Sequence, residues 1–216
     1  MRTILSTVLV LTTLMSIGQD KIWSGDTTFW YNLITDEWKR VGIEEISSSQ
    51  NLLRTKIATY NKIVEIWADD DCTFYGMQVL YFASFDLNYI KDPLYYSKRE
   101  ILNNDTAKLV QDLILKYKIH ELPIEDSIMG WGHSLGSVVY VDIDSYFIEN
   151  STVYSYSFKT YADPSVYRSI PEAARFAEFL YDLNALLGQE LKLNHFFDSL
   201  PYGNCYSIGG SLIRCK

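Results

Sequence analysis

The sequence has no excess of basic residues, no histidine cluster and only one long apolar run. Its 216 residues carry 19 Lys and Arg against 27 Asp and Glu, a formal net charge of −8. Proteins that bind nucleic acid or anionic membranes need clustered Lys and Arg, so we expect neither partner. The three His lie too far apart for a helix-borne metal pair, and no zinc-ligand spacing is present. We therefore expect no metal and no other cofactor.

The one long apolar run lies at the N-terminus. Arg2 precedes an apolar stretch at 4–15, and small residues follow at 16–18, which is the order of a secretory signal peptide. The run is shorter than the about 20 residues that a membrane-spanning helix needs. We predict a signal peptide at residues 1–18 and a single exported domain at residues 19–216. The mature chain would have no transmembrane span and would be periplasmic, cell-surface or extracellular.

Cysteine is scarce, and its count of three is odd. For an exported protein, we predict a disulfide between Cys205 and Cys215 that closes a short C-terminal loop. Cys72 is then left over, either buried as a small hydrophobic residue or paired instead with one of the other two. A catalytic Cys72 would need a His partner, and the sequence gives no signature that selects one.

Hydrophobic periodicity predicts an α+β domain with a mainly antiparallel sheet covered by two or three helices. Short turns separate the strand-like runs, and such turns join antiparallel neighbours. The predicted strands are 53–59, 62–68, 73–84, 138–143, 146–149 and 154–162, with a strand or hairpin at 205–215. Helices are predicted at 106–118, with Asn104 or Asp105 as its cap, between a Ser169–Glu172 capping box and Gly188, and at 191–200. Residues 28–41 suit either a helix or a strand and turn.

Residues 132–136 spell Gly-His-Ser-Leu-Gly, which matches the turn that carries the nucleophile of serine hydrolases. Ser134, then Asp163 or Asp182, then His195 follow the chain order of that triad. The nucleophile requires a strand–turn–helix, yet the residues after Ser134 are β-branched and aromatic, as in a strand. We therefore interpret the motif as a glycine-rich loop. A small serine hydrolase that uses Ser134 and His195, with Asp163 or Asp182 orienting the imidazole, is the alternative function.

Asp142 and Asp144 lie two apart in a predicted strand, so their side chains share one face about 7 Å apart. Glu149 can approach them from the neighbouring strand. Such carboxylates can bind a cation or act as acid and base on a sugar. The simpler interpretation, which we favour, is a solvated strand face opposite the buried residues Val139, Val141 and Ile143.

Aromatic residues are abundant, with 17 Tyr, 10 Phe and 5 Trp. Tyr154, Tyr156 and Phe158 share one face of a predicted strand, and Trp131 anchors the glycine-rich loop. An exposed aromatic face can bind sugars or peptides, whereas a covered one belongs to the core. We predict a non-catalytic binding or structural domain whose ligand is a peptide or glycan. These four aromatic residues are the candidate ligand-binding residues.

Several segments resemble a pattern in uncharacterised secreted bacterial proteins of this size. In them a Trp-Gly loop, here Trp131-Gly132, leads into a strand that ends in Glu, here 146–149. A Tyr-Ser-Phe-Lys strand follows, here within 154–164, and residues 63–67 are also similar. The resemblance implies an exported α+β domain in which residues 132–136 are a structural connection. It implies no known activity and transfers no catalytic residue.

Overall fold

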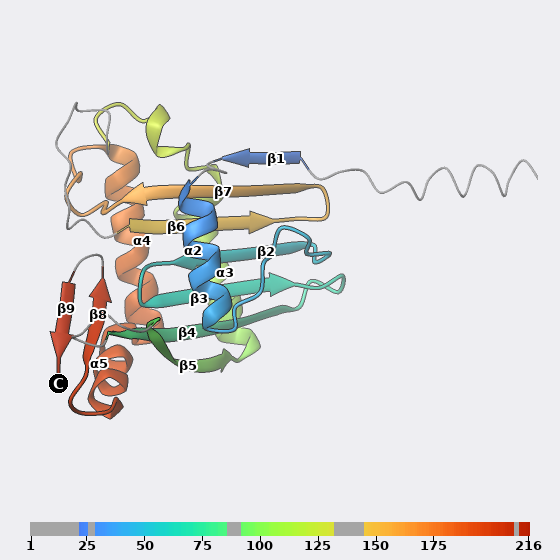
Figure 1. Cartoon of the computed structure of the whole chain (residues 1–216). Coiled ribbons are helices and arrows are strands. Elements are labelled where there is room, and N and C mark those ends of the chain that lie inside the picture. The colour runs from blue at the N-terminus through green and yellow to red at the C-terminus, as the bar shows by residue number, and fades with distance from the viewer. Residues whose placement is uncertain (1–21, 26–28, 86–91, 132–144, 210–211) are drawn as a thin grey trace, which may run out of the picture.

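The computed structural model describes residues 22–25, 29–85, 92–131, 145–209 and 212–216. Its centre is a nine-stranded sheet in the order β1-β7-β6-β2-β3-β4-β8-β9, with β5 also paired to β4 (Figure 1). Neighbouring strands are antiparallel, except that β1 and β7 are parallel. The strands are β1 (Ile22–Gly25), β2 (Leu53–Ala58), β3 (Lys62–Ala68), β4 (Phe74–Phe85), β5 (Leu94–Leu102), β6 (Ser145–Ser151), β7 (Ser155–Ala162), β8 (Cys205–Gly209) and β9 (Leu212–Cys215).

Helices cover both faces of this sheet. The helices are α2 (Phe29–Arg40), α3 (Asn104–Lys116), α4 (Pro171–Leu187) and α5 (Gln189–Ser199), with short 3-10 turns η1 (Ile119–Glu121) and η2 (Glu125–Ser127). α2 crosses one face, and α3 and α4 lie behind the other (Figure 1). Each face is buried in its own apolar cluster. The predicted α+β class and mainly antiparallel sheet are confirmed, with four α-helices in the described residues.

The ambiguous segment at 28–41 forms α2 and the turn that follows it. Ile34, Trp38 and Val41 recur at helical spacing and are 2 %, 1 % and 6 % exposed. They pack on the sheet with the apolar side chains of β3, β4, β6 and β7. The segment therefore forms a helix, as its helical periodicity indicates. The apolar side of this helix covers a sheet face that would otherwise be open to solvent.

The ends of the helices differ in part from the prediction. The predicted cap of α3 at Asn104 or Asp105 is wrong, because Asn103 is the cap: its side chain accepts a hydrogen bond from the backbone N–H of Thr106 at 2.8 Å. The expected capping box before α4 is wrong, because Ile170 occupies the cap position without a side-chain hydrogen bond. Gly188 ends α4 as predicted, with a left-handed φ of 61° that residues with a Cβ rarely adopt.

β5 is a strand that the sequence did not indicate. It pairs with β4 along nine residues, from Leu102 opposite Gly76 to Leu94 opposite Ser84. Most of its side chains are exposed. An edge strand with so little burial carries only a weak apolar alternation, so its pattern is hard to distinguish from a loop. The predicted strand at 138–143 lies outside the described residues.

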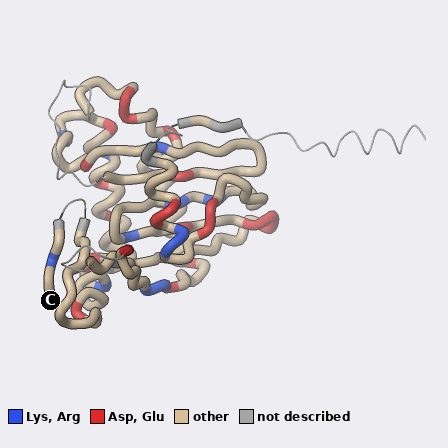
Figure 2. Tube along the Cα trace, viewed as in Figure 1, with Lys and Arg blue, Asp and Glu red and all other residues tan. Residues whose placement is uncertain are grey.

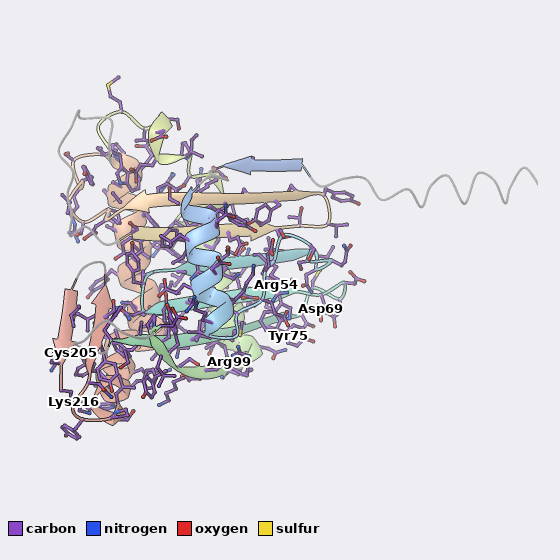
Figure 3. All side chains as sticks on the ribbon, in the orientation of Figure 1. Arg54, Asp69, Tyr75, Arg99, Cys205 and Lys216 are labelled. Carbon is purple, nitrogen blue, oxygen red and sulfur yellow. A yellow bond between two sulfur atoms is a disulfide. The ribbon has the colours of Figure 1, made fainter. Side chains whose placement is uncertain are left out.

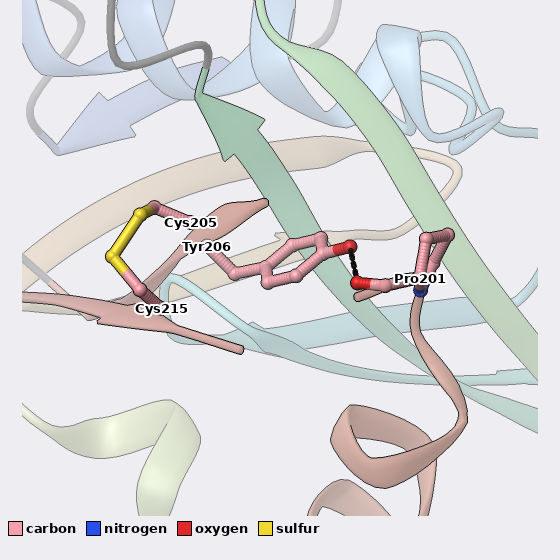
Figure 4. The surroundings of a disulfide bond; sticks show 4 residues. All are labelled: Pro201, Cys205, Tyr206 and Cys215. Carbon is pink, nitrogen blue, oxygen red and sulfur yellow. Dashed lines mark hydrogen bonds between the residues drawn. A yellow bond between two sulfur atoms is a disulfide. The ribbon is translucent and has the colours of Figure 1, made fainter. Parts of the chain in front are cut away.

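The C-terminal hairpin of β8 and β9 contains the predicted disulfide. Cys205 and Cys215 are directly opposite each other in the two strands and are bonded (Figure 4). The buried Tyr206 donates a hydrogen bond from its hydroxyl to the carbonyl of Pro201 at 2.7 Å. Cys72 is free and exposed, so the alternative pairings are wrong, and so is the expectation that an unpaired Cys72 is buried.

Candidate functional site

The residues of the hydrolase alternative are not joined in the part of the chain that the structure describes. Ser134 lies outside the described residues. Asp182 accepts a hydrogen bond from the hydroxyl of Tyr117 at 2.7 Å, and this contact lowers the pKa of Asp182. Asp163 follows β7, and His195 is exposed on α5. Among the described residues, no hydrogen bond or ion pair connects His195 to either aspartate.

The two aspartates of the carboxylate hypothesis, Asp142 and Asp144, also lie outside the described residues. Glu149 is described and is fully buried in β6. The described residues contain no group of three or more His, Cys, Asp or Glu placed to hold a metal ion. Glu149 belongs instead to a network of buried charges on the α2 side of the sheet.

Three of the four candidate aromatic residues are in the core. Trp131, Tyr156 and Phe158 are 0 %, 1 % and 0 % exposed, whereas Tyr154 is 71 % exposed. The indole of Trp131 donates to the carbonyl of Ala162 at 3.2 Å. Tyr156 and Phe158 pack beneath α2, which covers this face of β7. The interpretation of these three as ligand-binding residues is corrected to a structural role, because none presents a surface to a ligand.

A row of charged side chains crosses the sheet beneath α2. Lys56 of β2 lies opposite Glu65 of β3 on one side and opposite Glu149 of β6 on the other. All three side chains are at most 1 % exposed. The ammonium of Lys56 donates to a Glu149 carboxylate oxygen at 2.7 Å and to the backbone carbonyl of Glu44 at 3.0 Å. It also lies 4.7 Å from the centre of the Trp38 ring.

Two further side chains extend this network. The hydroxyl of Tyr156 donates to the other oxygen of Glu149 at 2.6 Å, and burial together with Glu149 raises the pKa of Tyr156 far above its ordinary range. On the other side of the row, Arg54 donates from Nε to Glu65 at 2.5 Å. Burial raises the pKa of Glu65, and Lys56 and Arg54 oppose that rise.

Sequence inspection missed this network because alternation in a strand shows which residues share a face, not whether that face is covered. Arg54, Lys56 and Ala58 form one face of β2, which resembles an ordinary solvated face. The available signal was the match of charges, since a cation in β2 has an acidic residue opposite it in each neighbouring strand. Register had to be known before that match could be recognised.

A cleft opens on the opposite face, between α4, the β2–β3 hairpin and the turn after β7. Its volume is about 210 Å³. The floor is apolar and includes Ile57, Val64, Ala177 and Leu183. The rim carries charges of both signs, from Lys62, Asp163, Arg168 and Glu190.

The rim of the cleft is partly organised by its own ion pair. The ammonium of Lys62 donates to Glu190 at 2.8 Å, and the side-chain amide of Asn184 donates to the same oxygen at 3.2 Å. Along the chain, both acidic and basic residues are spread over many of the elements (Figure 2). An apolar floor with a few convergent polar groups is the usual form of a small-ligand site.

No family model, curated protein or solved structure matches the chain. None of the described helices is long and apolar enough to cross a membrane. The function is therefore inferred from the geometry and chemistry of the described residues.

Proposed function

We propose that this chain is a non-catalytic binding domain of the cell envelope or the extracellular space, and that the α4 cleft is its ligand site. The observation that carries the proposal is the open apolar floor beneath a rim of charges of both signs. The Cys205–Cys215 disulfide is compatible with an oxidising compartment, which agrees with the signal-peptide pattern at residues 1–18.

The chemistry of the cleft favours a ligand without a large net charge. Lys62 and Glu190 already neutralise each other, and Asp163 and Arg168 add one charge of each sign. A peptide segment or a neutral glycan can place an apolar group on the floor and hydrogen-bond to this rim. A highly charged polyanion would meet as much repulsion as attraction.

To test this proposal, one substitution fills the cleft, and the binding of wild type and variants to peptide and glycan arrays is compared. Ala177 lies on the floor, is 8 % exposed, and faces the cleft from α4. In Ala177→Leu the added side chain occupies the site, so we expect array signals of the wild-type chain to be lost. Ala185→Leu adds the same bulk at an exposed position of α4 and should preserve those signals. Arrays on which the two variants behave alike would remove the cleft from consideration.

The serine hydrolase alternative predicts a different result. A fluorophosphonate probe that labels the wild-type chain but not Ser134→Ala would identify a nucleophile and replace the binding proposal. This alternative also predicts that Asp163→Asn or Asp182→Asn slows labelling, because one of these aspartates would orient the imidazole of His195. We expect no labelling above that of the heat-denatured chain.

A further inference from the structure

The α2 side of the sheet has a hollow of its own, separate from the α4 cleft. Residues 41–52 leave the C-terminal end of α2 and return to β2 (Figure 1). The residues that line the hollow come from this segment and from strands β2 to β5. Its volume is about 350 Å³. Arg54 and Arg99 contribute charge to its lining, and Trp67, Met77 and Ile101 contribute apolar surface. Figure 3 labels Arg54, Arg99 and the neighbouring Tyr75 in this part of the molecule.

Both guanidinium groups are positioned by contacts that use only part of their donor capacity. Arg99 donates from Nη2 to the carbonyl of Gly42 at 2.6 Å, and Arg54 donates from Nε to the buried carboxylate of Glu65 at 2.5 Å. A guanidinium has five N–H donors in a planar fork. Within the described residues, the other donors have no hydrogen-bond partner, and the fork matches the two oxygens of a carboxylate.

A carboxylate of the chain already lies near this place. Glu44 is also part of the lining, and its carboxylate is 3.7 Å from Nη2 of Arg54, with 82 % of the side chain exposed. Such an exposed contact contributes little stability, so a ligand carboxylate with better geometry can displace it. Glu44 thus shows which chemistry Arg54 attracts, and it would compete with a ligand for that position.

The remaining lining selects for an apolar group beside the anion. Trp67 stacks on Tyr75 with ring centres 6.0 Å apart, and the guanidinium carbon of Arg54 lies 5.9 Å from the Trp67 ring centre. This stack holds Trp67 and Arg54 in place. Ile101 is 69 % exposed, and Met77 lies beside it in β4, so both can contact an apolar group.

We propose that this hollow binds a carboxylate carrying an apolar body, either a free small carboxylic acid or the C-terminal residue of a peptide. The carboxylate would bridge Arg54 and Arg99, and the apolar body would lie on Met77, Ile101 and the edge of Trp67. The site is independent of the α4 cleft, because the two lie on opposite faces of the sheet.

The experiment titrates the folded chain with 3-phenylpropanoate and follows the indole N–H signal of Trp67 by NMR. We expect saturable binding that is absent with 3-phenylpropanamide, which has the same body without the charge. A short peptide ending in Phe, with its C-terminus free or amidated, distinguishes the second source of the same chemistry. If only the free acid binds, the ligand is a small carboxylic acid; if the free peptide binds more tightly, it is a C-terminus.

Three variants separate a built site from general attraction of an anion. Arg99→Gln should raise the dissociation constant about tenfold, because it removes one charged hydrogen-bond donor to the ligand carboxylate. Lys98→Gln removes the same charge from the adjacent residue, whose side chain points to the other face of β5, and should leave the dissociation constant unchanged. Glu44→Gln should tighten binding severalfold, because it removes the competing carboxylate.

Several outcomes would overturn the proposal. They are equal binding of acid and amide, equal losses in Arg99→Gln and Lys98→Gln, no gain in Glu44→Gln, and no saturable shift up to about 10 mM ligand. Circular dichroism melting of each variant verifies that it is folded. Arg54 is left unchanged in these tests, because its removal would leave Glu65 buried without that partner.

Discussion

Replacing Lys56 by Met tests the buried charge network directly. The substitution keeps an apolar side chain against Trp38 but removes the ammonium, which donates a hydrogen bond to Glu149 at 2.7 Å. The Lys56 side chain is only 1 % exposed. Removing one partner of a buried ion pair costs about 3–5 kcal/mol, since the other charge stays buried and unpaired. A domain has only about 5–15 kcal/mol of stability, so Lys56→Met should lose a large fraction of it.

The assay is urea unfolding at pH 7, followed by tryptophan fluorescence with the disulfide intact. Lys56→Met/Glu149→Gln should recover at least half of the loss, because an amide needs no cation and still accepts from Tyr156. Lys39→Met is the matched control, because Lys39 is 57 % exposed in a surface pair with Asp36. Its loss should stay within about 0.5 kcal/mol. If Lys56→Met is no less stable than Lys39→Met, the buried row contributes nothing and the reasoning is wrong.

The loss in Lys56→Met should also depend on pH, with a sign set by Glu65. Burial raises the pKa of Glu65 above 4.5, and Lys56 opposes that rise. Without Lys56 the pKa of Glu65 in the folded state should rise further. A carboxyl whose pKa is higher in the folded than in the unfolded state contributes most to the stability of the fold below its unfolded pKa. This contribution is lost as the pH rises through the folded pKa. The difference between wild type and variant should therefore grow from pH 5 to pH 8.

Two further predictions concern α2 and the C-terminal hairpin. Burial raises the pKa of Glu37 to about 7, so the wild-type chain should lose stability as the pH rises from about 4.5 through 7. Glu37→Gln should then be about 1–2 kcal/mol more stable than wild type at pH 8 and show no gain at pH 5, with stability measured from urea unfolding midpoints. An equal gain at both pH values would contradict the raised pKa of Glu37. Replacing Cys205 and Cys215 by Ser should lower the free energy of unfolding by about 2–3 kcal/mol, because the bond closes a loop between residues ten apart. Hydrogen exchange should show the largest loss of protection in β8 and β9, and uniform loss across the sheet would argue against a local role.

The sequence by itself determined the local elements where periodicity was strong. β2, β3 and β4 follow from short apolar runs separated by polar turns, and α4 follows from its apolar stripe and the glycine at 188. The disulfide followed from cysteine spacing and the export pattern. These features depend on residues close in sequence, so a window of ten to twenty residues contains the cause.

Only the tertiary structure decided which strand faces are covered and what meets across them. Alternation put Tyr156 and Phe158 on one face, and α2, more than a hundred residues away, made that face part of the core. Lys56 and Glu149 became partners through the pairing of β2 with β6, and Arg54 and Arg99 reached one hollow through β3, β4 and β5. Such contacts join residues distant in sequence, and their free energy depends on burial, which the order of residues along the chain does not contain.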